Sequence, residues 1–155
     1  MRIGFFPNMG KSTIMAVLKM AAHICREEQI EVYLPDDLER PDTYKVLQIP
    51  KENVLPRPEI FKHIDVAFSF GGDGTIIHLA RQIFSYNIPV CGINLGELGF
   101  LNQIEVHQLQ SHIKRIAQGD YTIEKRAHLH AYIDKEDGTR EDLVPIINEV
   151  VIPCP

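Results

Sequence analysis

The segment whose residue types most directly suggest chemistry is Gly71-Gly72-Asp73-Gly74-Thr75, between an apolar run at Asp65–Phe70 and a helix-forming stretch. Glycines let a backbone approach a phosphate, and the N-terminus of the following helix adds partial positive charge. Asp73 is out of place in a purely anion-binding loop because a carboxylate repels phosphate. We therefore predict a catalytic Asp73, which accepts a proton from an attacking hydroxyl or helps to hold a magnesium ion. A local capping role is the alternative. The predicted phosphate-binding residues are Gly71, Gly72, Gly74 and Thr75.

A second glycine-rich segment, Gly92–Leu101, follows the next expected strand at Pro89–Ile93. It lacks the G-x-G-x-x-G spacing, so the sequence does not predict a Rossmann fingerprint. Two such loops after successive strands are expected to form a cleft, because ligands of open α/β sheets bind beyond the carboxyl ends of strands. Phe100 stacks on a base there or enters the core, and its residue type alone favours the core.

Asn148 and Glu149 interrupt an apolar run at Ile146–Ile152. A polar pair is costly to bury without partners. A carboxylate beside an amide can hydrogen-bond the hydroxyls of a ribose, whereas an exposed edge or bulge is the alternative.

Two further motifs are weaker. Gly10-Lys11-Ser12-Thr13 resembles the end of a P-loop, but the upstream Gly4 stands one residue too far away, so we expect a turn and a helix capped by Ser12 or Thr13. His128 and His130 share a strand face without an apparent third ligand, and no metal site is predicted.

The elements that position these motifs begin with a β-α-β pattern, which favours a parallel sheet. Its parts are the strand Arg2–Phe6, the helix Ile14–Cys25 and the strand Ile30–Leu34. Residues 35–58 are rich in proline and predict a long irregular connection with one short strand near Val46–Ile49. A helix is expected over Val106–Ala117, and from Tyr121 onward strand follows strand, with an Asp-Gly hairpin turn in Lys135–Thr139. We predict an α/β domain with an open, mostly parallel sheet over residues 1–121, followed by the start of an all-β domain over 122–155.

Composition excludes several classes of function. The chain has 155 residues, a net charge of −5 and a pI near 5.8, which argues against nucleic acid or an anionic membrane as partner. No apolar run is long enough for a membrane span, and the N-terminus does not resemble a signal peptide. Three widely spaced cysteines argue against a disulfide framework, so we expect a cytoplasmic protein with reduced thiols.

Taken together and in order, G-G-D-G-T, G-I-N-x-G-x-L-G-F-L and N-E-V-V-I resemble the NAD kinase family, which depends on ATP or polyphosphate. Ile3–Asn8 also resembles the first strand of that family. The first motif alone is shared with diacylglycerol and sphingosine kinases and, more loosely, with phosphofructokinases. The resemblance implies an N-terminal domain like that of NAD and diacylglycerol kinases. It also implies direct transfer of the γ-phosphoryl group of magnesium-bound ATP, or of polyphosphate, to the 2′-hydroxyl of the adenosine ribose of NAD, which yields NADP.

The resemblance also implies roles for individual residues. Asp73 is the catalytic residue, and the implied NAD-binding residues are Asp73, Gly74, His78, Leu98, Gly99, Phe100, Asn148 and Glu149. Members of the family are usually longer and carry an all-β second domain that supplies oligomer contacts. We therefore expect a homo-oligomeric full-length form, of which this chain is the first part. The alternatives are an NAD- or ATP-binding module without turnover, and a lipid or sugar kinase that shares the G-G-D-G-T turn.

Overall fold

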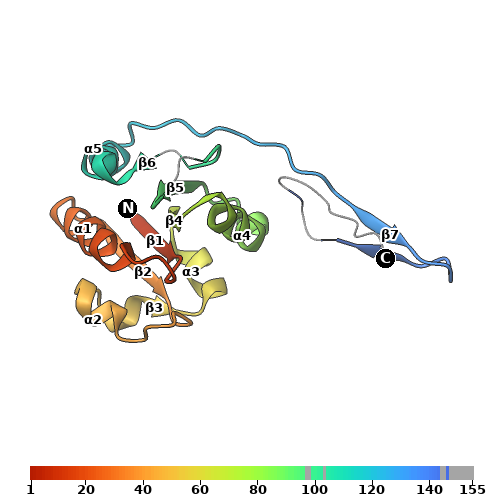
Figure 1. Ribbon diagram of the computed structural model, residues 1–155, viewed down its shortest axis with the longest axis horizontal. Coiled ribbons are helices and arrows are strands. Elements are labelled where there is room, and N and C mark those ends of the chain that lie inside the picture. The colour runs from red at the N-terminus through yellow and green to blue at the C-terminus, as the bar shows by residue number, and fades with distance from the viewer. Residues whose placement is uncertain (97–98, 103, 144–145, 147–155) are drawn as a thin grey trace. The chain divides into compact units, whose positions relative to one another are not determined.

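The computed structural model describes residues 1–96, 99–102, 104–143 and 146. Contacts along the chain divide it into two compact units, residues 1–122 and 123–155. The first unit is an α/β domain built on a six-stranded sheet (Figure 1). The predicted fold class, an open and mostly parallel sheet with flanking helices, is confirmed.

The six strands lie in the order β3-β2-β1-β4-β5-β6, and each neighbouring pair runs parallel. The strands are β1 (Arg2–Pro7), β2 (Glu31–Pro35), β3 (Val54–Leu55), β4 (Val66–Gly71), β5 (Val90–Asn94) and β6 (Ile104–Glu105). The chain starts at the centre of the sheet, winds to one edge through β3, and then returns to build the other half. The strand order therefore reverses between β1 and β4, and such a switch point is where open α/β sheets bind ligands.

Helices cover both faces of this sheet, as Figure 1 shows. On one face lie α1 (Ile14–Glu27), α2 (Thr43–Leu47) and α5 (Leu109–Ala117); on the other lie α3 (Arg57–His63) and α4 (Asp73–Ile83). Short 3₁₀ helices are found at Lys51–Asn53, Phe84–Tyr86 and Val106–Gln108.

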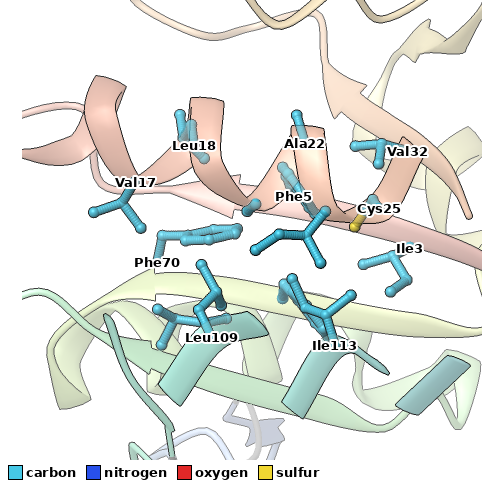
Figure 2. Packing of buried hydrophobic residues seen from close by; sticks show 14 of the residues in the cluster. Ile3, Phe5, Val17, Leu18, Ala22, Cys25, Val32, Phe70, Leu109 and Ile113 are labelled. Carbon is cyan, nitrogen blue, oxygen red and sulfur yellow. The ribbon is translucent and has the colours of Figure 1, made fainter. Parts of the chain in front are cut away.

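The larger core lies between the sheet and the α1–α5 layer (Figure 2). Phe5 and Phe70 from the sheet meet edge to face, with ring centroids 4.8 Å apart. Leu18 of α1 and Leu109 of α5 are fully buried against them. Because β1 and β4 are covered on both faces, they read as continuous apolar runs, as central parallel strands do. This packing fixes the sheet edge from which the glycine turns emerge.

The connection over residues 35–58 differs from its prediction. Val46 lies in α2, not in a strand at Val46–Ile49, and the short strand is β3. Asn53 Nδ2 donates to the carbonyl of Val32 at 3.2 Å, which ties this connection to β2. The expected side-chain cap of α1 is also absent: Thr13 is the N-cap residue but its hydroxyl makes no capping hydrogen bond.

The second unit contains an antiparallel hairpin of β7 (Tyr132–Asp134) and β8 (Arg140–Asp142). Gly138, with φ of +80°, forms the predicted Asp-Gly turn. Within the part of the chain that the structure describes, no helix is long and apolar enough to cross a membrane.

Candidate functional site

The first glycine turn joins β4 to α4 at the reversal point of the sheet. Gly71 ends β4, Gly72 is the N-cap of α4, and Asp73 is its first residue. A carboxylate in the first turn of a helix interacts favourably with the partial positive charge there. The amide of Thr75 donates to the carbonyl of Gly72 at 3.0 Å and closes the turn.

The side chain of Asp73 holds the second glycine-rich segment. Its Oδ2 accepts a hydrogen bond from the backbone amide of Phe100 at 2.8 Å. Its Oδ1 accepts from the amide of Leu101 at 3.2 Å and from Nδ2 of Asn102 at 2.8 Å. The two loops that the sequence placed after successive strands therefore meet, and a single carboxylate joins them.

These contacts also set the charge state of Asp73. Partial burial acts to raise its pKa, but the hydrogen bonds from the Phe100 and Leu101 amides and from Asn102 outweigh burial and lower the pKa below its ordinary value. Asp73 is accordingly a carboxylate at neutral pH. It accepts hydrogen bonds well and binds a proton weakly.

Two glycines of these segments leave no space for a side chain. A Cβ added to Gly99 would overlap the Asp73 carboxylate, and one added to Gly71 would overlap Oγ1 of Thr75. Gly99 therefore has no room for a larger residue while the two segments keep their present contact, and Gly71 has none while Thr75 keeps its position.

Two other glycines of the same turn face open space. A Cβ on Gly72 or Gly74 would meet no atom within 4 Å. Gly72 has an ordinary φ of −99°, so its backbone does not require glycine. The packing of the chain therefore gives no reason for glycine at these positions, whereas close approach by a ligand would.

Phe100 corrects the expectation, drawn from its residue type, that it enters the core. Its side chain is 98% exposed, although its amide is bonded to Asp73. An exposed aromatic side chain thus belongs to the residue whose amide binds the carboxylate. Three of the predicted NAD-binding residues, Leu98, Asn148 and Glu149, lie outside the described residues.

Asn102 belongs to the site but was missed in the sequence. It is 7% exposed, and its Oδ1 is buried with no hydrogen-bond partner. The signal was present: Asn102 is the first polar residue after Phe100-Leu101, one position beyond the segment that was singled out.

His78 is not among the partners of Asp73. It lies five residues later on α4, about 140° further around the helix. Its Nε2 is instead 2.8 Å from Nε2 of Gln82, in a separate polar network.

The turn after β1 completes this edge of the sheet. The amide of Asn8 donates to the carbonyl of Phe70 at 2.9 Å, which holds the turn beside β4. Lys11 Nζ would lie 3.9 Å from a Cβ on Gly96, so a cation stands near the second glycine segment. Gly4 lies inside β1, against the Phe6 ring, and so it does not begin a phosphate-binding loop. This position agrees with the expectation that the Gly10–Thr13 segment is not a P-loop.

The donor atoms around Asp73 do not form a magnesium site by themselves. Both oxygens of Asp73 already accept protein N–H groups. Among the residues that the structure describes, no group of three or more His, Cys, Asp or Glu side chains could hold a metal ion. These residues do not form a protein cage for a resident cation.

A comparison with known families decides the relationship. The family model of the ATP-NAD kinase N-terminal domain matches residues 3–121. The chain belongs to the NAD kinase family. The matched residues include β1, both glycine-rich segments and α5, and so all of the site described above.

Individual proteins that are similar to this member of the NAD kinase family are themselves NAD kinases. An NAD kinase of Natranaerobius thermophilus is 31% identical over 153 residues, which are 97% of this chain and 50% of that protein. An NAD kinase of Hydrogenovibrio crunogenus is 42% identical over 98 residues, which are 63% of this chain and 33% of that protein. The chain thus spans a third to a half of the length of these relatives.

Among solved structures, the crystal structure of yeast NADH kinase complexed with NADH matches with a TM-score of 0.73 and 16% sequence identity. The match covers 93% of this chain and 45% of the yeast chain. This likeness shows a shared fold.

Proposed function

We propose that this chain carries the catalytic half of an NAD kinase site, which transfers the γ-phosphoryl group of ATP, or a phosphoryl group of polyphosphate, to the 2′-hydroxyl of the adenosine ribose of NAD. The observation that carries the proposal is the placement of Asp73. Its carboxylate lies at the reversal point of the sheet, between two glycine-rich segments, beside the open faces of Gly72 and Gly74. Membership of the NAD kinase family supports the same substrate class.

Asp73 orients the attacking hydroxyl in this proposal. Three N–H donors occupy most of the lone-pair directions of its carboxylate and lower its pKa. A strong base works best with a pKa near the operating pH, whereas a low pKa suits an acceptor that aligns an O–H bond. Phosphoryl transfer needs little more, because catalysis there rests mainly on positioning and charge stabilisation.

The step balances as a direct displacement. The 2′-oxygen forms a bond to the γ-phosphorus while the bond from that phosphorus to the bridging β–γ oxygen breaks, and ADP leaves. The hydroxyl proton, held in a hydrogen bond to Asp73, is released to solvent as the new phosphate ester forms.

The donor phosphates are assigned to the glycine turn. The N-terminus of α4 carries partial positive charge next to the open space at Gly72 and Gly74, and Nζ of Lys11 adds a positive charge near Gly96 of the second segment. Magnesium enters with ATP as part of the substrate, since the described residues form no cage for it.

The acceptor is assigned to the other side of Asp73. Phe100 offers an exposed ring on which the adenine can stack. Leu98 and Gly99 are proposed to bind NAD as well. Asn148 and Glu149 are proposed to hold a ribose of NAD. We further propose that the full-length protein is a cytoplasmic homo-oligomer that binds neither nucleic acid nor membranes, which is consistent with the net charge of −5.

The test is an acceptor panel on the chain as it stands. NAD, NADH, a diacylglycerol and a hexose phosphate are each incubated with ATP and magnesium, and ADP release and NADP formation are measured. Turnover with NAD or NADH alone is the expected result. Turnover with the lipid or the sugar phosphate would replace the proposal with a lipid or sugar kinase.

A second candidate is a nucleotide-binding module without turnover, which is favoured by the partial coverage of the relatives. Calorimetry separates it from the first candidate. Binding of NAD without formation of NADP would support the module, and NADP formation would exclude it.

A further inference from the structure

A chain of polar side chains runs along the carboxyl edge of the sheet toward α4. Arg57, the first residue of α3, donates from Nε to Oδ2 of Asp37 at 2.8 Å. Its Nη1 donates to Oε1 of Gln82 at 3.1 Å. Nε2 of Gln82 then lies 2.8 Å from Nε2 of His78, one helical turn away on α4. Asp37 follows β2 and Arg57 follows β3, so the topology brings these residues to the edge that carries Asp73.

The direction of each hydrogen bond in this chain is fixed by chemistry. A guanidinium only donates, so the group of Gln82 that faces Arg57 must be its oxygen. The amide nitrogen of Gln82 therefore faces His78 and donates to it. Nε2 of His78 must accept, and the proton of the neutral ring then resides on Nδ1.

Arg57 has further contacts beside the one to Gln82. Its side chain is 26% exposed, and it is paired with the carboxylate of Asp37. Its guanidinium carbon also lies 5.7 Å from the centroid of the Phe6 ring, near the end of β1. The oxygen of Gln82 is thus anchored by a residue with contacts on two further elements.

We propose that Arg57 and Gln82 are positioning residues, which hold His78 as the neutral Nδ1–H tautomer so that it offers a single, defined ring donor to the dinucleotide. The part of this proposal that concerns the dinucleotide rests on the proposed function. The tautomer itself does not depend on it. A free imidazole side chain favours the proton on Nε2. The tautomer assigned to His78, with the proton on Nδ1, is therefore the one that a free side chain disfavours.

The tautomer is measured by the ¹⁵N chemical shifts of the histidine rings at pH 8.5, where an ordinary histidine is neutral. The signal of His78 is assigned by its loss in His78→Gln. We expect the Nδ1–H pattern in the unmodified chain. The Nε2–H pattern there would overturn the proposal.

Substitution of Gln82 gives the sharper comparison. Gln82→Glu keeps the acceptor for Arg57 but replaces the donor that faces His78 with an acceptor, so the ring proton should move to Nε2. Gln82→Leu removes the donor without adding charge and should shift the population in the same direction. Gln118→Glu, on an exposed position that ends α5, is the matched control and should leave His78 unchanged. Retention of the Nδ1–H pattern in both Gln82 variants would refute the role of Gln82.

Binding of NAD tests the functional part. Gln82→Leu should weaken NAD binding by roughly 2- to 10-fold, the loss of one well-placed hydrogen bond, and Gln118→Glu should not. If the tautomer changes but the Kd of NAD does not, His78 does not serve the dinucleotide and the positioning role is wrong. If the unmodified chain binds no NAD, the proposed function fails while the ¹⁵N result still decides the tautomer.

Discussion

Asp73 has a structural role in addition to the catalytic role that its sequence motif predicts. Its carboxylate holds the Phe100–Asn102 segment through three hydrogen bonds, and the same contacts lower its pKa. A residue singled out for chemistry therefore also shapes the site. Substitution of Asp73 is expected to affect both the position of the loop and the reaction.

The depressed pKa of Asp73 predicts a pH dependence of stability. Because the pKa in the folded state lies below the ordinary value of 3.8, its stabilising contribution is fully present above that value. The contribution is lost as the pH falls through the lower, folded-state pKa. The free energy of unfolding in urea, measured from pH 6 to pH 2, should show Asp73→Asn less stable than the unmodified chain at pH 6, with the gap closing in acid. A gap that stays constant down to pH 2 would show that these hydrogen bonds do not favour the carboxylate.

Phe100 predicts a separation between binding and stability. Phe100→Ala should weaken NAD binding by roughly 5- to 100-fold, since base–aromatic stacking is worth about 1–3 kcal/mol. The melting temperature should not change, because the ring is 98% exposed. The control is Val46→Ala, which truncates an exposed apolar side chain on α2, away from the site. It should change neither the NAD affinity nor the melting temperature. Unchanged NAD affinity in Phe100→Ala would remove the ring from the site.

At the level of elements, the site depends on two turns that follow neighbouring parallel strands, β4 and β5. Both turns begin at the same level of the sheet. Gly71 of β4 pairs with Asn94 of β5, so the following segments start side by side. The amide of Leu95 donates to the carbonyl of Gly71 at 3.3 Å, and Oδ1 of Asn94 accepts from the amide of Gly96 at 3.1 Å. These bonds leave the two segments facing each other across Asp73.

The glycines of the two turns should respond in opposite ways to the addition of a methyl group. Gly99→Ala should destabilise the chain by about 1–3 kcal/mol, because its Cβ overlaps the Asp73 carboxylate. Gly74→Ala should stabilise α4 by about 0.5–1 kcal/mol yet weaken nucleotide binding, since its Cβ projects into open space that the ligand is proposed to fill. Urea unfolding and calorimetry with NAD and ATP measure the two effects. Gly74→Ala that binds both nucleotides normally would place the ligands elsewhere.

The sequence predicted the long elements because their patterns are complete. The buried apolar run of β4 and the helical periodicity of α1 each extend over enough residues to be recognised. The short elements could not be predicted in this way. Helix α2 has five residues and β3 has two, so neither completes a pattern, and Val46 was placed in a strand. The residue type of Phe100 favoured the core, and only the resemblance to a family assigned it to the NAD site. Its exposure could not be predicted from hydrophobicity, because its backbone amide is bonded to Asp73 while its side chain stays 98% exposed.

At the scale of the molecule, the first unit contains a complete core of its own. Among the described residues, both apolar clusters against the sheet draw all their members from before residue 122, including Ile113 of α5 and Leu79 of α4. In the second unit, Leu129, Tyr132 and Ile133 remain largely exposed. The stability of the chain should therefore reside in the first unit.

This division predicts that a chain ending at Thr122 folds by itself. Its free energy of unfolding and its melting temperature should match those of the 155-residue chain, because the core of the sheet is intact. Urea denaturation followed by circular dichroism measures this directly. A loss of cooperative unfolding in the shorter chain would show that residues beyond 122 complete the first core.

The most direct test of the central claim is NADP formation by this chain and by its Asp73→Asn variant, with NAD, ATP and magnesium, read by an NADP-specific dehydrogenase. Asp65→Asn is the matched control, because Asp65 also has a lowered pKa but pairs with Arg2 away from the turn. We predict that Asp73→Asn lowers turnover by about 100-fold or more, the order of loss expected when the attacking oxygen is no longer held in line, while NAD still binds and Asp65→Asn remains active. Equal turnover in Asp73→Asn and the unmodified chain would contradict the role of Asp73 and, with it, the proposed site.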